Sequence, residues 1–125
     1  MKDIFLTLSE VVDIHADQIA RYGGSSGIRD INLLSSAVAM PFASFSGGYL
    51  HDDIYEMAAA YAFHICQNHP FVDGNKRTAL VSALVFLEMN GKSIIDESGK
   101  LYDAMISLAT GQLGKSEFAK ILRTM

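Results

Sequence analysis

One apolar stretch limits what this chain can fold into more than any other feature of its 125 residues. Between Thr78 and Met89 only Ser82 and Glu88 are clearly polar. A helix over this stretch is predicted to be buried, because it has no continuous polar face to turn toward water. Its free N–H groups are expected to emerge near residues 74–77, just before the apolar residues begin.

The nine residues directly before Thr78 combine several reactive side chains. They read His69-Pro70-Phe71-Val72-Asp73-Gly74-Asn75-Lys76-Arg77 and are called the motif loop below. An imidazole, a carboxylate, an amide and two cations meet in this short segment. Together with the free N–H groups and the positive end of the helix dipole, the two cations favour a polyphosphate ligand.

Each part of the motif loop also has an ordinary structural explanation. His69-Pro70 can simply mark a loop, and Asp73-Gly74-Asn75 is a common turn sequence in which Asp or Asn caps a helix. Lys76-Arg77 can be a solvated first turn. Cations at that position oppose the helix dipole, however, and this small penalty suggests that a bound anion offsets it.

The composition predicts one compact helical domain over residues 1–125. Half of the residues are apolar, two are proline and none is tryptophan, which does not describe a disordered or fibrous chain. The net charge of -4 argues against nucleic-acid binding over the whole surface, because neutralising phosphates requires a dominant cationic face. A local cationic pocket remains compatible with this charge.

Cys66 is the one cysteine of the sequence, so neither an intrachain disulfide nor a cluster of thiolate metal ligands can form. This fits a reducing cytoplasm. The first residues lack the features of a secretion signal, and no apolar run reaches the roughly 18 residues that a membrane span needs. We therefore expect a soluble protein of the cytoplasm.

The spacing of apolar residues predicts six helices separated by turns. A glycine-rich loop covers residues 23–27, and Asp30 is expected to cap the second helix. Residues 41–50 are rich in Gly, Ser and aromatic residues and look extended or irregular, which makes them a candidate flap. Residues 93–95 are a candidate extended piece. The expected helices cover about 9–22, 30–41, 53–68, 74 or 75 to 90, a segment ended by Gly111, and a segment beginning near Ser116.

The chemistry of the motif loop suggests a role for each polar residue. His69 is the candidate general base, because an imidazole accepts protons near neutral pH. Asp73 is a hard oxygen ligand placed where a nucleotide-bound Mg²⁺ would lie. Gly74 lets the backbone approach a ligand, and the residues expected to hold the nucleotide with it are Asn75, Lys76 and Arg77.

The remaining residues of interest have plainer interpretations. Phe71 is expected to point into the core and anchor the motif loop. His64 lies on an apolar helix, where packing is a more common role than catalysis. His15 and His51 have no assigned role, and Cys66 is expected to pack as a small hydrophobic residue, because no cation adjacent in sequence would lower its pKa.

The motif loop, together with Thr78-Ala79-Leu80, resembles the signature His-Pro-Phe-x-Asp/Glu-Gly-Asn-x-Arg of the Fic/Doc family. The resemblance covers essentially the whole chain, because the first half is similar to the Doc (death-on-curing) branch. It implies a compact all-α fold of about six helices with a short flap, in which a central helical hairpin carries the motif loop. The residues that carry the Doc resemblance are Ile14-His15, Arg21-Tyr22-Gly23-Gly24, Gly27, Asp30 and Ser36-Ala37-Val38.

The activity that the resemblance implies depends on the branch. Fic proteins that transfer AMP continue the signature as Gly-Asn-Gly-Arg-x-x-Arg, whereas this chain has Lys76 at the second glycine and Leu80 at the last arginine. The Doc branch also has lysine there, and it implies a reversed ATP that presents its γ-phosphate to a protein hydroxyl. The resemblance thus implies a protein kinase toxin that phosphorylates a threonine of elongation factor Tu and arrests translation. AMP transfer is the alternative within enzymes.

The same resemblance assigns roles and partners. It makes His69 the base, Asp73 the Mg²⁺ ligand and residues 75–77 the phosphate holders, and residues 41–50 would bind the target backbone as an added strand. Residues 93–97 nearly match the inhibitory helix of some Fic enzymes, but they lie in an expected turn. Doc-type toxins are instead restrained by a separate antitoxin, which implies a partly exposed apolar groove. An inactive antitoxin-binding module is the second alternative, and the oligomeric state stays open.

Overall fold

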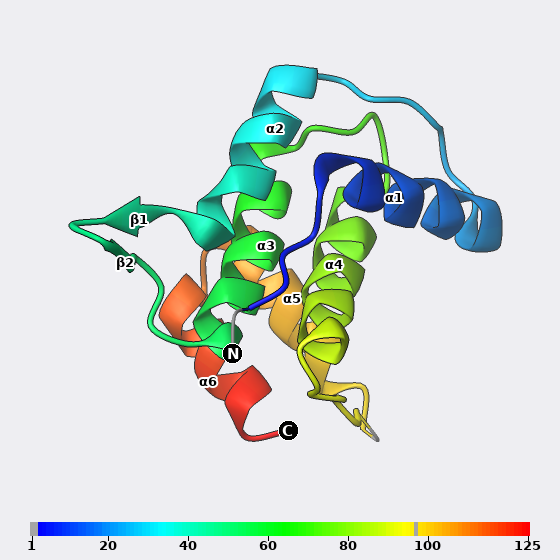
Figure 1. Ribbon diagram of the computed structural model, residues 1–125. Helices are drawn as coiled ribbons and strands as arrows, with labels where there is room; N and C mark the ends of the chain where they lie inside the picture. Colours follow the sequence, from blue (N-terminus) through cyan, green and yellow to red (C-terminus); the bar gives the residue numbers. More distant parts are fainter. Residues whose placement is uncertain (1–2, 97) are drawn as a thin grey trace.

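The computed structural model describes residues 3–96 and 98–125 and contains six α-helices in that part of the chain (Figure 1). This confirms the expected all-α fold. Over the described residues, no helix combines the length and the apolar character needed to span a bilayer. The helices are α1 Leu8–Tyr22, α2 Ile31–Ala39, α3 Ile54–Asn68, α4 Asn75–Met89, α5 Lys100–Thr110 and α6 Lys115–Arg123.

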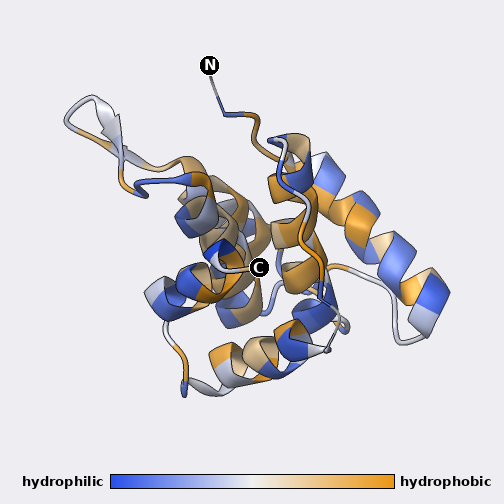
Figure 2. Ribbon diagram, turned by 90° about the horizontal axis from the view of Figure 1, so that it is seen from below, coloured by the Kyte–Doolittle hydropathy of each residue, from blue (hydrophilic) through white to orange (hydrophobic). Residues whose placement is uncertain are grey.

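Helices α3 and α4 pack against each other and form the centre of the molecule. Helices α2 and α6 pack on α3, whereas α1 packs on α4. Figure 2 shows hydrophobic residues concentrated on the helix faces that turn toward this centre, and hydrophilic residues on the outer face of α1. The apolar stretch after the motif loop is α4, and its residues Ala79, Ala83, Phe86 and Leu87 are fully buried as predicted.

The helix ends follow capping signals that are visible in the sequence. Asp30 accepts hydrogen bonds from the N–H groups of Asn32 and Leu33 and so caps α2, as predicted. Asp53 caps α3 by accepting from the Glu56 N–H. The first helix begins one residue earlier than predicted, because a capping box of Thr7 and Glu10 precedes it. The sixth helix likewise begins one residue early, at Lys115.

The candidate flap is a short β-hairpin that follows the 3₁₀ helix η1 Met40–Phe42. Strands β1 Ser44–Phe45 and β2 Gly48–Tyr49 pair antiparallel, and Phe45 is 78% exposed. The prediction of an extended or irregular segment is therefore confirmed. Figure 1 shows the hairpin projecting beside the N-terminal half of α3, which is the half that does not end at His69.

Gly91 directly follows residue 90, where the fourth helix is expected to end, and its φ of 86° is the left-handed exit that a glycine at that position favours. Residues 93–95 form neither strand nor helix. The segment compared with an inhibitory helix is not helical over residues 93–96, and its last residue, Glu97, lies outside the described residues. Gly111 ends α5 with a φ of 83°.

Candidate active site

The motif loop begins with a sharp change of direction at the end of α3. His69 is the C-cap of that helix and has a left-handed backbone, with φ 48° and ψ 54°, which is uncommon for a residue other than glycine. The guanidinium of Arg29 holds this conformation, because its Nε donates to the His69 carbonyl at 2.6 Å and its Nη2 to the Asn68 carbonyl at 3.0 Å. The predicted helix boundary at His69 is confirmed.

The connection between α1 and α2 pairs with the middle of the motif loop. The N–H groups of Arg29 and Asp30 both donate to the Pro70 carbonyl, at 2.7 and 3.0 Å. The Val72 N–H donates to the Gly27 carbonyl at 3.1 Å. The motif loop is therefore held by backbone hydrogen bonds to a segment that is distant in sequence. The sequence predicts a loop over residues 23–27 but does not predict this pairing.

Phe71 anchors the motif loop in the core, as predicted, and its partner is His15. The Phe71 ring is fully buried and stacks on the imidazole of His15 with centroids 3.8 Å apart and planes 4° apart. The Nε2–H of His15 donates to the backbone carbonyl of Asp73 at 2.8 Å. His15 had no predicted role, although its spacing of four residues from the buried Val11 placed it on the inner face of α1.

The Asp73 carboxylate is exposed and keeps capacity for a further ligand. Its Oδ2 accepts the Ser25 N–H at 3.1 Å, and its Oδ1 accepts the Gly74 N–H at 2.8 Å. These two N–H groups, with a smaller contribution from Arg77, lower the pKa of Asp73. The side chain is therefore anionic at neutral pH, which suits a Mg²⁺ ligand.

A Mg²⁺ ion at Asp73 would take most of its ligands from phosphate oxygens and water. Among the described residues, no group of three or more His, Cys, Asp and Glu side chains could hold a metal ion. Mg²⁺ is commonly bound by one or two carboxylates with phosphate oxygens and water. One carboxylate beside a phosphate-binding helix end fits that pattern.

The amide of Asn75 is used inside the motif loop. Its Oδ1 accepts the Phe71 N–H and its Nδ2 donates to the Phe71 carbonyl, both at 2.9 Å. The same Nδ2 lies 3.3 Å from Nδ1 of His69. Asn75 is also buried, at 5% exposure, so in this structure it organises the loop that carries His69.

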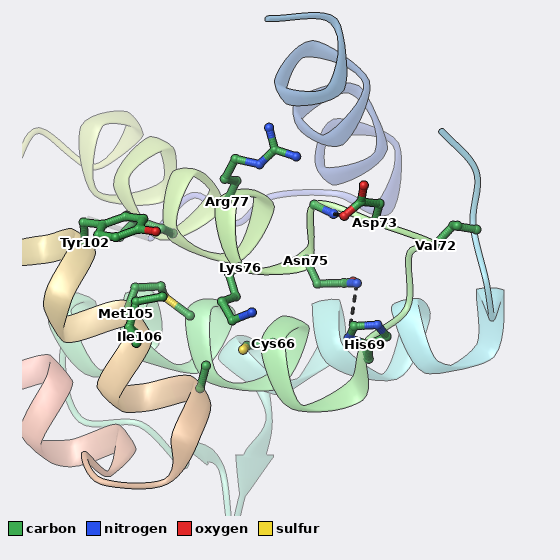
Figure 3. Close-up of a pocket in the computed structure, with 13 residues that line it drawn as sticks. Cys66, His69, Val72, Asp73, Asn75, Lys76, Arg77, Tyr102, Met105 and Ile106 are labelled. Carbon is green, nitrogen blue, oxygen red and sulfur yellow. Dashed lines mark hydrogen bonds between the residues drawn. The ribbon is translucent and has the colours of Figure 1, made fainter. Parts of the chain in front are cut away.

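Lys76 and Arg77 point in different directions (Figure 3). Lys76 is exposed and directs its amine toward the side of Cys66. The guanidinium of Arg77 turns to the end of α1, where Nη2 donates to the Gly23 carbonyl at 3.0 Å and Nη1 to the Gln18 carbonyl at 3.5 Å. Arg77 is therefore not a solvated first-turn residue, because it ties α4 to α1.

All six predicted site residues line one cavity of about 490 Å³ (Figure 3). The cavity lies at the N-terminus of α4, where the free N–H groups of the helix emerge. Its far wall is apolar and comes mostly from α5, which sequence reasoning did not connect with the motif loop. The lining residues are His69, Asp73, Gly74, Asn75, Lys76 and Arg77, together with Cys66, Val72, Leu80, Tyr102, Met105, Ile106 and Ala109.

Cys66 is half-buried beside this cavity and behaves as predicted for a packing residue. Burial raises the pKa of its thiol, and the nearby charge of Lys76 lowers it by less. No cation is adjacent to Cys66 in sequence, but Lys76 on α4 lies near it in the structure. It does not make the thiol a ready nucleophile, because the effect of burial is larger.

His51 and His64 lie apart from the cavity, around the amine of Lys115. The Nζ atom of Lys115 is 3.1 Å from Nε2 of each imidazole. Burial, followed by the charge of Lys115, lowers the pKa of His64 to about 4. His64 therefore has the packing role expected for it, and these three residues are called the Lys115 cluster below.

Comparison with known proteins agrees with this geometry. A family model described as "Fic/DOC family" matches residues 5–87. The "Protein kinase doc" of Escherichia phage P1 is 35% identical over 116 residues, which are 93% of this chain and 90% of that protein. The "Toxin Doc" of Mycolicibacterium smegmatis is 43% identical over 70 residues, 56% of this chain and 54% of that protein. This chain belongs to the Fic/Doc family.

Proposed function

We propose that this protein is a Doc-like toxin that transfers the γ-phosphate of ATP to a hydroxyl group of another protein. The observation that carries the proposal is the cavity in which His69, Asp73 and Lys76 meet. It brings a proton acceptor, an anionic oxygen ligand and a cation to the N-terminus of a buried helix. Similarity to the relative named protein kinase doc, over 93% of the chain, supports the same interpretation.

In the proposed reaction His69 is the general base. It takes the proton of the target hydroxyl, whose oxygen attacks the γ-phosphorus of ATP. The bond between that phosphorus and the oxygen bridging it to the β-phosphate breaks, and ADP leaves. A positioned base of this kind contributes roughly 10²- to 10⁴-fold to the rate.

The phosphates are proposed to lie against the N-terminus of α4. Lys76 is the most accessible cation of the motif loop, and Gly74 has no side chain to keep a phosphate away from the backbone. Arg77 keeps further N–H donors beyond those that it gives to Gly23 and Gln18. Asp73 would hold Mg²⁺, which when bound neutralises charge on the phosphate oxygens.

The proposed target is a threonine of elongation factor Tu in the cytoplasm, as the family resemblance implies. The hairpin of β1 and β2 would bind the target backbone as an added strand, because a two-stranded hairpin leaves unpaired backbone groups at its edges. Its exposed Phe45 would give that interaction an apolar contact. Phosphorylation of this threonine would arrest translation.

An antitoxin segment is proposed to bind an apolar hollow between the N-terminal segment and α2. This hollow has a volume of about 470 Å³ and does not overlap the cavity of the motif loop. It matches the partly exposed apolar groove that an antitoxin requires. Its lining residues are Phe5, Leu6, Thr7, Leu8, Ser35, Val38, Ala39 and Phe42.

One transfer assay tests the activity. The protein is incubated with Mg²⁺, elongation factor Tu and ATP labelled at either the α- or the γ-phosphate. Transfer of the γ label alone supports the kinase, whereas transfer of the α label supports AMP transfer. No transfer, despite tight binding of a cognate antitoxin, supports the inactive binding module.

Two variants make the assay specific. His69→Ala should lose transfer, whereas His64→Gln, on the same helix but outside the cavity, should keep it. Full activity of His69→Ala would show that the base is wrongly assigned. Lys76→Gly should weaken γ transfer, because it removes the accessible cation, and an unchanged rate would exclude a role for that cation.

A further inference from the structure

We propose that Asn75 is a positioning residue that selects one tautomer of His69, with the proton on Nε2 and the basic lone pair on Nδ1. This goes beyond the phosphate-holding role proposed for Asn75. Its consequence for catalysis rests on the proposed function, whereas the tautomer of His69 is a property of the free protein and can be tested without that function. The contact that carries it is the 3.3 Å approach of Asn75 Nδ2 to His69 Nδ1.

The orientation of the Asn75 amide is dictated by the backbone of Phe71. The Phe71 N–H can only donate, and the Phe71 carbonyl can only accept, each at 2.9 Å from the amide. If the amide were turned over, its NH₂ group would face the Phe71 N–H and its oxygen would face the Phe71 carbonyl, so neither hydrogen bond could form. The group that approaches His69 is therefore the NH₂ of Asn75 and not its oxygen.

The NH₂ group of Asn75 then determines what Nδ1 of His69 can be. An amide nitrogen is a donor only, and one of its two hydrogens is already given to the Phe71 carbonyl. The other is available to Nδ1, which must accept it with a lone pair. A proton on Nδ1 would instead place two N–H groups against each other, so a neutral ring carries its proton on Nε2.

The chemical consequence concerns the route of the transferred proton. Within the described part of the chain, Nε2 of His69 has no hydrogen-bond partner, so its proton faces solvent or a bound ligand. A hydroxyl that gives its proton to the resting ring must reach Nδ1, from the side where Asn75 lies. The O–H bond then breaks, an N–H bond forms at Nδ1, and the resulting imidazolium loses its contact with Asn75.

Nuclear magnetic resonance of the ¹⁵N,¹³C-histidine-labelled protein tests the proposal without nucleotide or target. The four histidines provide their own references. His15 donates from Nε2, and the ammonium of Lys115 requires Nδ1–H rings at His51 and His64. His69, assigned with a His69→Gln sample and recorded where its ring is neutral, should be Nε2–H by at least about tenfold over Nδ1–H.

Two variants link the tautomer to Asn75. Asn75→Asp offers an acceptor in place of the donor and should move His69 toward Nδ1–H, while the His15 signals stay unchanged. Asn75→Ala, used also in case the Asp variant does not fold, should reduce the excess of Nε2–H severalfold. A wild-type Nδ1–H ring, or a tautomer ratio that neither variant changes, would overturn the proposal. Failure of γ transfer with the expected spectrum would reject the proposed function and leave this inference intact.

Discussion

The histidines beside the motif loop and those of the Lys115 cluster use the same side chain in opposite ways. His15 is a buried donor, with its Nε2–H on the Asp73 carbonyl and its face on Phe71. His51 and His64 are acceptors, because both direct Nε2 at one ammonium. In addition, Nδ1 of His51 is buried and makes no well-formed hydrogen bond in the described structure, although the Pro41 carbonyl lies near enough to raise the pKa of this imidazole somewhat.

This difference determines whether each region is sensitive to substitution or to pH. Apart from the approach of Asn75 to the His69 ring, the contacts that hold the motif loop are directed at backbone groups, which do not change their charge, and they leave the carboxylate of Asp73 exposed. Contacts in the Lys115 cluster involve three titratable groups within hydrogen-bonding distance. We therefore expect the motif loop to lose stability mainly when a packed side chain is removed. The Lys115 cluster should lose stability mainly when the protonation of its histidines changes.

The largest effect is expected from His15→Ala compared with His51→Ala. The two imidazoles are similarly buried, at 4% and 5% exposure, so a difference between the two variants does not come from a difference in burial. His15→Ala should lower the free energy of unfolding by about 2–4 kcal/mol, because it loses a buried stacked ring and a partly buried hydrogen bond. His51→Ala should cost about 1–2 kcal/mol, because its Nδ1 makes no well-formed hydrogen bond that could be lost. Equal costs in urea unfolding would remove the distinction between the regions.

The next effect separates two neighbouring glycines at the end of α1. Gly24 has a φ of 114°, and a Cβ there would lie 2.6 Å from Oδ2 of Asp73. Gly23 has a φ of 83°, but a Cβ there would meet nothing within 4 Å. Both alanine variants should lose about 1 kcal/mol of stability to backbone strain. Only Gly24→Ala has to displace the carboxylate.

Activity is the readout that distinguishes these two glycine variants. Because Gly24→Ala moves the proposed Mg²⁺ ligand, it should lower γ transfer by roughly tenfold or more and raise the Mg²⁺ concentration needed for half-maximal rate. Gly23→Ala should stay close to the parent at a temperature where both are folded. If the two variants have the same rate, the position of the Asp73 carboxylate does not limit the reaction.

The sequence predicts the helices and the contents of the site because both depend on local signals. Apolar spacing, Pro70, Gly91 and Asp30 each act within a few residues, and the structure has the expected feature at each position. The six site residues are close in sequence, so they line one cavity almost by necessity. What could not be predicted from the sequence depends on contacts between distant segments.

Three long-range features illustrate that limit. Arg29 holds the His69 carbonyl, His15 supports Phe71, and α5 supplies the apolar wall of the cavity. None has a local pattern, because each depends on how α1, α2 and α5 pack around the central helices. The direction of Arg77 could not be predicted either. Its guanidinium donates to the end of α1, and the motif sequence alone does not indicate that contact.

A smaller effect concerns the pH dependence of the Lys115 cluster. His64 has a pKa lowered to about 4 by burial and by Lys115, against 6.5 for an exposed imidazole. Folding therefore disfavours its protonation, so its contribution to stability is complete above pH 6.5 and is lost as the pH falls toward about 4. His51 adds to this loss in the same direction, because burial and Lys115 also lower its pKa.

Lys115→Met tests the cause of this acid sensitivity. The variant keeps an apolar stem of similar size but removes the ammonium, so the pKa of His64 should rise and the loss of stability between pH 7 and pH 4.5 should be smaller than in the parent. Unfolding by urea at the two pH values measures the difference. Titratable groups away from the Lys115 cluster are the same in both proteins, so their contribution cancels in the comparison. An identical pH dependence would mean that Lys115 does not control the cluster.

The smallest effect is expected at the other cation that joins α6 to α3. Arg123 Nη2 lies 2.7 Å from Oδ2 of Asp53, and both side chains are 41% exposed. Arg123→Gln should therefore cost less than about 1 kcal/mol, and about 1 M salt should remove most of that difference. Asp53→Ala should cost more than Arg123→Gln at every salt concentration, because it also removes the cap of α3. If high salt leaves the cost of Arg123→Gln unchanged, the contact of its guanidinium with the Tyr55 ring, 5.6 Å away, matters more than the ion pair.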